Sequence, residues 1–138
     1  MFMLTMGAGM NLGFPDVCIT PIPTPVGPVP TPLPYPDINM SVVSAPAAYN
    51  VLVDCMPAIN QMSKGLMSNG DEPGVLGGIS SHLIDGQTEY FVGCFTIFVD
   101  GVPAQRLTSV TGQNSVGMLP NAPGTCLAPS QVTVLALG

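Results

Sequence analysis

The chain has 138 residues, of which 46% are apolar and only 7% are charged, and its net charge is −6. A single domain over residues 1–138 with a real hydrophobic core fits this length. Lys64 and Arg106 are the only cations, which argues against a nucleic-acid partner and against a basic membrane-binding patch. Typical soluble domains are about 25% charged, so we expect much of this surface to be covered by a protein partner or to be formed by glycine, serine, threonine and asparagine.

The first ten residues, MFMLTMGAGM, contain a short apolar stretch without a cationic segment before it. No run of about 20 residues is both apolar and free of proline and glycine clusters. We therefore expect synthesis in the cytoplasm without a signal peptide, and no stable membrane insertion.

A proline-rich segment comes next, with eight prolines between Pro21 and Pro36 and no charged residue among them. Proline fixes φ and lacks an N–H donor, so the segment is predicted to be a rigid polyproline-like or edge-strand ribbon with few backbone hydrogen bonds of its own. Apolar residues between the prolines favour packing against an apolar wall; they are Ile22, Val26, Val29, Leu33 and Tyr35. The alternative is that this segment is a binding site for another protein.

Two copies of an apolar strand followed by a turn lie 46 residues apart, with the sequences VDCMPA (53–58) and VDGVPA (99–104). An aspartate at the start of a turn can bond the next backbone N–H groups, and a proline after it ends sheet pairing on that side. The repeat predicts duplicated β-units. Its structural turn residues are Asp54, Pro57, Asp100 and Pro103.

Other regular elements are few, because 16 glycines and 16 prolines interrupt most windows. The best helix candidate is residues 57–67, and Gly65 weakens it. Predicted strands cover residues 51–53, 89–92, 95–99 and 132–137. The last of these strands ends the chain without room for a turn of its own. The fold class is therefore mainly β with very little helix.

A turn-rich connection over residues 69–81 holds Asp71 and Glu72. The pair is interpreted as a solvated loop tip, since no second cluster of titratable groups in the sequence supports a carboxylate site.

No catalytic residue is predicted, and the chain is not expected to be an enzyme. His82, the only histidine, could be drawn into a nucleophilic pair with Cys18 or Cys94, oriented by Asp85, but any chain with cysteines offers such a set. Sequence motifs of hydrolases and nucleotide-binding enzymes do not occur in the chain.

The four cysteines, Cys18, Cys55, Cys94 and Cys126, are widely spaced and include no CxxC pair. They are predicted to be reduced and buried, with disulfides as the alternative if the protein works outside a cell. No cofactor is favoured. If zinc binds, the ligands would come from Cys18, His82 and Cys126.

Taken in order, the motifs of the chain resemble those of PAAR-like proteins. These motifs are GMNLGFPDVCITP (9–21), PYPDINMS (34–41), the two VDxxPA turns, SNGDEPG (68–74) and NAPGTCLAPSQVTVLALG (121–138).

The resemblance implies a small cone of short strands with approximate threefold internal repetition. Such a cone caps the trimeric VgrG spike of a bacterial type VI secretion system or a related contractile injection machine, one tip per trimer, and carries effectors or adaptors. It implies delivery outward with the apparatus to the extracellular space or a target cell, and no fused effector domain is expected here. The zinc site of better-known members needs three histidines, so it is not carried over to this chain. Residues expected to contribute to the partner-facing base are Phe14, Pro15, Val17, Ile38 and Met40.

Overall fold

The computed structural model describes residues 1–137, and its regular structure is almost entirely β. One 3-10 helix, η1 (Ser41–Val43), accompanies the strands. The strands are β1 (Met10–Thr24), β2 (Gly27–Met40), β3 (Ser44–Ala45), β4 (Ala48–Val53), β5 (Met56–Ala58), β6 (Lys64–Gly65), β7 (Gln87–Val92), β8 (Cys94–Val99), β9 (Val102–Ala104), β10 (Val110–Ser115) and β11 (Ala122–Ala128). The predicted mainly β fold with very little helix is confirmed. The helix predicted over residues 57–67 is wrong, since β5 and β6 occupy this part of the chain.

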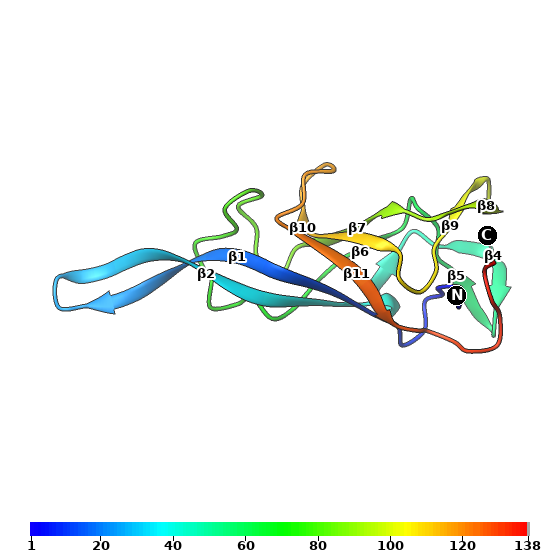
Figure 1. Cartoon of the computed structure of the whole chain (residues 1–138), viewed down its shortest axis with the longest axis horizontal. Coiled ribbons are helices and arrows are strands. Elements are labelled where there is room, and N and C mark those ends of the chain that lie inside the picture. The colour runs from blue at the N-terminus through cyan, green and yellow to red at the C-terminus, as the bar shows by residue number, and fades with distance from the viewer. Residues whose placement is uncertain (138) are drawn as a thin grey trace.

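Seven strands form one antiparallel sheet in the order β2-β1-β11-β10-β7-β6-β3. The long β1–β2 pair projects from one end of the molecule, and both chain termini lie at the opposite, broader end (Figure 1). No helix in the described part of the chain is long and apolar enough to cross a membrane.

The proline-rich segment is a β-hairpin rather than a ribbon without its own hydrogen bonds. β1 pairs with β2 from Met10 opposite Met40 to Thr24 opposite Gly27, with one irregularity near Gly13. Alternate residues of a strand direct their N–H groups to opposite sides. Pro25 lies in the turn, and the other prolines of the segment fall on the alternate positions that face away from the partner strand, so they leave the pairing intact.

Two small units repeat at the broad end, namely β4–β5 and β8–β9. Their registers are equivalent: Ala48 opposite Ala58 in the first unit corresponds to Cys94 opposite Ala104 in the second. The two long strands share the same alternation of buried and exposed residues. The predicted repeat is therefore a structural repeat.

The two chain termini build a third unit of the same kind. Phe2 forms an antiparallel bridge with Leu135, as Pro57 does with Leu52 in the first unit. The N–H of Ala136 donates to the Met1 carbonyl at 2.7 Å. The last strand thus needs no turn, because residues from the start of the chain supply its partner.

Backbone hydrogen bonds join the three units in a closed ring. Leu4 N–H donates to the Gln105 carbonyl at 2.9 Å, Gln105 N–H to Ile59 at 3.1 Å, and Ile59 N–H back to Leu4 at 3.0 Å. Leu4, Ile59 and Gln105 occupy the same position in their units, and each is 0% exposed. We call residues 1–6, 48–61, 94–107 and 131–137 the three-unit base, which has pseudo-threefold symmetry.

The base has the main apolar core of the protein, whereas the large sheet encloses polar side chains. One residue or more from each unit enters the core cluster of Met3, Ala48, Val53, Ala58, Val99, Ala104 and Ala136. Within the sheet, the buried Asn11 amide donates to the side-chain oxygen of Asn39 at 3.1 Å and to the Tyr90 hydroxyl at 2.9 Å. A hydrogen-bonded polar interior of this kind favours a single arrangement of the chain, because a buried polar group without a partner would cost free energy.

Candidate functional site

The surface of the three-unit base has large apolar side chains at equivalent positions of the three units. Each is between 52% and 66% exposed. The first set is Tyr49, Phe95 and Val132, and the second set is Leu52, Phe98 and Leu135. We refer to these six residues as the base patch.

Strand geometry explains why these side chains are exposed. Successive residues of a strand point to opposite faces, and the residues that follow Leu52, Phe98 and Leu135 point into the core: Val53, Val99 and Ala136. Leu52, Phe98 and Leu135 therefore cannot turn inward without moving these residues out of the core. Exposed apolar surface of this kind is typical of sites where proteins associate.

A second feature is a buried polar cluster between β1 and the later loops. One oxygen each from Asp16 and Asp71 and the sulfur of Cys18 lie within 4.8 Å of one another. The Asn114 amide donates to Asp16 at 2.6 Å and to Asp71 at 2.5 Å. The Cys18 thiol donates to the same two carboxyl groups, at 3.4 and 3.5 Å. These contacts hold the loop at Asp71 and strand β10 against β1.

Within residues 1–137, the hydrogen bonds of this cluster come from amide, thiol and backbone donors and from no cationic side chain. Lys64 pairs with Glu89 at 2.7 Å, and Arg106 donates to the Ala136 carbonyl in the base. Amide and thiol donors therefore take the place of counter-charges in this interior.

Burial shifts the titration of these groups. It raises the pKa of Asp16 and, with the negative charges of Asp71 and Asp16, raises the pKa of Asp37 to about 8. Both oxygens of Asp37 are buried without a hydrogen-bond partner. Burial and the neighbouring Asp71 raise the pKa of Asp85 to about 6, and burial raises the pKa of the Cys18 thiol. Folding thus shifts the protonation equilibrium of each of these groups toward its protonated form, relative to the unfolded chain.

Asp71 does not lie at a solvated loop tip, so that prediction is wrong for this residue. Its side chain is 0% exposed, and its oxygen accepts from the Asp85 N–H at 3.2 Å. Glu72 is exposed, as predicted. The sequence did not single out Asn114 or Asn121, whose amides donate to the Asp16 carboxylate.

The structure does not bring together the three residues considered for zinc. Cys18 lies with Asp16 and Asp71, and no group containing His82 or Cys126 forms in the described chain. His82 is exposed on a loop. Cys126 packs with Leu4, Ile59 and Tyr90 in a second apolar cluster, and burial raises its pKa to about 12.

The four thiols are free. Cys18, Cys94 and Cys126 are buried as predicted, whereas Cys55 is exposed. Cys55 follows Asp54 in the two-residue turn between β4 and β5, and both have a positive φ. A residue at such a turn faces solvent, which explains the difference.

The predicted turn residues and the residues expected to face a partner lie in two different parts of the structure. Asp54 and Asp100 begin the turns of the first and second units, and Pro57 and Pro103 lie on the strands that follow. The five residues expected at the partner-facing base lie elsewhere, on β1 and β2: Phe14, Pro15, Val17, Ile38 and Met40. Their contact with a partner stays a prediction.

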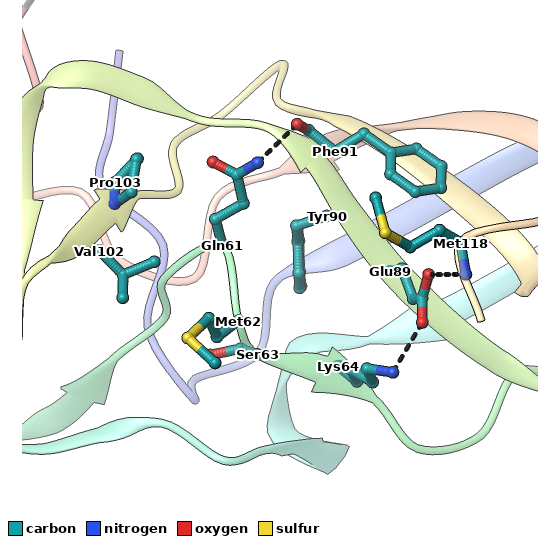
Figure 2. A pocket seen from close by; sticks show the side chains of 10 residues that line it. All are labelled: Gln61, Met62, Ser63, Lys64, Glu89, Tyr90, Phe91, Val102, Pro103 and Met118. Atoms are coloured by element: carbon teal, nitrogen blue, oxygen red, sulfur yellow. Dashed lines mark hydrogen bonds and ion pairs between the residues drawn. The ribbon is translucent and has the colours of Figure 1, made fainter.

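A cavity of about 410 Å³ lies beside β7 (Figure 2). Its walls are mostly apolar, and the Lys64–Glu89 ion pair lies at one side. The Gln61 amide donates across it to the Phe91 carbonyl at 2.8 Å. Its lining residues are Gln61, Met62, Ser63, Lys64, Glu89, Tyr90, Phe91, Val102, Pro103 and Met118. None of these is a histidine or cysteine, and the one carboxylate is already paired.

Comparison with known proteins gives one match. The model of the toxin PAAR-like domain family matches residues 9–124. No curated protein and no solved structure matches the chain. The match covers most of the large sheet and two units of the base, while the third unit lies outside it. With most of its residues matched by this model, the chain belongs to the toxin PAAR-like domain family.

Proposed function

We propose that this protein is a non-enzymatic tip that caps a trimeric VgrG-type spike, one chain per trimer, in a type VI secretion system or a related contractile injection machine. The three-unit base carries this proposal. Family membership supports an association with a spike-forming secretion machine. In this function the tip sharpens the spike, couples effectors to it and travels outward with the apparatus.

The symmetry of the base supports this stoichiometry. A single chain can contact three identical subunits equally only if it presents three similar surfaces about one axis. The ring through Leu4, Ile59 and Gln105 defines such an axis. The base patch then offers each spike subunit one aromatic or aliphatic pair, which is the type of residue that contributes most to the centre of an interface.

The second candidate, an adaptor that uses the proline-rich segment as its binding site, has less support. Grooves that recognise proline-rich peptides take a single polyproline helix. In this chain, β1 and β2 pair along the whole segment, from Thr24 and Gly27 at the turn to Met10 and Met40. Binding in such a groove would require the hairpin to open.

Co-purification with a VgrG-type trimer tests the proposal. Leu52→Asp, Phe98→Asp and Leu135→Asp each place a charge at the same position of one unit, and we expect three similar losses of affinity of at least about tenfold. Val26→Asp, at the opposite end of the molecule, is the matched control and should bind like the unchanged protein. Unchanged binding by all three base variants would remove the support for the proposal.

A further inference from the structure

The exposed carboxylates of the protein concentrate on the three-unit base. The chain has eight acidic residues, and most of them are buried or half-buried: Asp16, Asp37, Asp71, Asp85 and Glu89. The three exposed ones are Asp54, Glu72 and Asp100. Asp54 and Asp100 follow β4 and β8 at equivalent positions of the first and second units. Two of the three exposed acids therefore lie at the broad end of the molecule, opposite the projecting hairpin (Figure 1).

Asp54 and Asp100 border the base patch. Alternate residues of a strand share a face, so each acid continues the outward side of the base-patch residue two positions before it, Leu52 or Phe98. In the third unit the equivalent residue is Leu137, which is 69% exposed. The base thus presents an apolar centre with a carboxylate at the edge of two of its three units.

The turns themselves do not require a negative charge. Asp54 and Asp100 have φ angles of 53° and 56°, in the left-handed region that asparagine and glycine also adopt. Within residues 1–137, the Asp54 carboxylate has no hydrogen-bond partner, and Asp100 has one exposed contact of 3.5 Å from the Asn50 amide. Neither acid forms an ion pair in this part of the chain. The backbone conformation explains a residue that tolerates a positive φ, and leaves the charge unexplained.

We propose that the base docks on a surface with cationic side chains around an apolar centre, and that Asp54 and Asp100 steer this docking. The inference rests on the proposed capping function and names the chemistry of the spike end: each spike subunit places a lysine or arginine opposite the turn of a unit. Opposite charges at the rim of an interface act mainly on the rate of association, and their attraction weakens in salt. The apolar base patch then holds the complex.

Charge also argues against other partners for this face. A second copy of the chain, docked base to base, would bring the same carboxylates together, and like charges at an interface oppose association. An anionic membrane surface or a nucleic acid would repel them in the same way. A partner with basic groups at its rim is the one that these two acids favour.

Replacement of each acid by asparagine tests this role, because asparagine fits the same left-handed turn and removes only the charge. Asp54→Asn and Asp100→Asn should keep the thermal midpoint and should each associate with a VgrG-type trimer about two- to fivefold more slowly at low salt, with little change in the rate of dissociation. The double variant should lose most of the salt dependence of the association rate between about 0.05 and 0.5 M. Glu72→Gln, which removes the exposed acid outside the base, is the matched control and should associate like the unchanged protein.

Addition of charge gives the opposite test. Leu137→Asp supplies the third unit with the acid that the other two have, and it should speed association by a similar factor. Asp54→Lys should slow association more than Asp54→Asn does.

Three outcomes would overturn the proposal. If both asparagine variants associate at the unchanged rate and with unchanged salt dependence, the acids serve only the turns. An equal effect of Glu72→Gln would assign the change to net charge rather than to the base. In both cases the complex still forms, so the capping function stands. If the unchanged protein forms no complex with the trimer, the capping function fails together with this inference.

Discussion

The side-chain amide of Gln131 donates to the backbone carbonyl of Met3 at 2.8 Å and so joins the last segment of the chain to the first. Its oxygen accepts from the N–H groups of Thr133 and Val134, at 2.7 and 2.8 Å. The side chain is 6% exposed. In the first two units a covalent turn holds the strands together, whereas in the third unit this glutamine is one of the few links.

Gln131→Ala should therefore destabilise the protein by about 2–4 kcal/mol, because several buried groups lose their partners at once. Urea unfolding measures this directly. Val132→Ala, at the neighbouring exposed position, is the control and should change the free energy of unfolding by no more than about 0.5 kcal/mol. Equal effects of the two variants would show that the third unit does not depend on Gln131.

Asn114→Ala should destabilise by about 2–4 kcal/mol, since the amide joins Asp16 and Asp71 and its removal takes one buried donor from each carboxyl group. Its oxygen also accepts from the Gly86 N–H at 2.6 Å. Asn50→Ala, which removes an exposed amide with one long contact of 3.5 Å, should have little effect. An Asn114→Ala protein as stable as the unchanged one would contradict this role of the amide.

The free energy of unfolding should fall as pH rises. The pKa of Asp37 is raised to about 8 in the folded protein, from the ordinary aspartate value of 3.8. The folded state therefore binds more protons between these values, so the stability from protonated Asp37 is complete below about 4 and is lost as pH passes through about 8. Denaturant unfolding at pH 5 and pH 9 should show the difference.

Asp37→Asn removes the titrating group at the same site and should flatten this dependence. A smaller slope should persist, because the pKa of Asp85 is also raised, to about 6. An unchanged slope in Asp37→Asn would assign the pH dependence to other groups.

Purified protein should contain no stoichiometric metal, and a chelator should not change its thermal midpoint. The Asn114 amide and the Cys18 thiol already donate to the oxygens of Asp16 and Asp71. An amide N–H cannot ligate a cation, so binding would require these bonds to break. Elemental analysis of the unchanged protein and of Cys18→Ser decides the point. One equivalent of metal that disappears in Cys18→Ser would contradict the expectation.

Local signals predicted the parts of the fold that depend on neighbouring residues. The VDxxPA sequence brings an aspartate into a tight turn wherever it occurs, so both Asp54 and Asp100 could be assigned from the chain. The alternation of prolines could also have predicted a paired hairpin, because it leaves every second N–H of the ribbon available to a partner strand.

Contacts between distant segments could not be predicted in this way. Leu135 pairs with Phe2, and no turn links them, so only the similarity of TVL (133–135) to TIF (96–98) hints at a third unit. Asp71 is bonded by the amide of Asn114 on β10, 43 residues later in the chain. Hydrogen bonds between distant aspartate and asparagine side chains leave no periodic pattern in the sequence. A single aspartate in a glycine-rich loop is usually exposed to solvent.

The mass of the complex formed with a VgrG-type trimer tests the central claim most directly. A base with three similar units about one axis predicts a single species with one tip chain and three spike chains, even when the tip is in excess. Three tip chains per trimer, or no complex at all, would contradict the account.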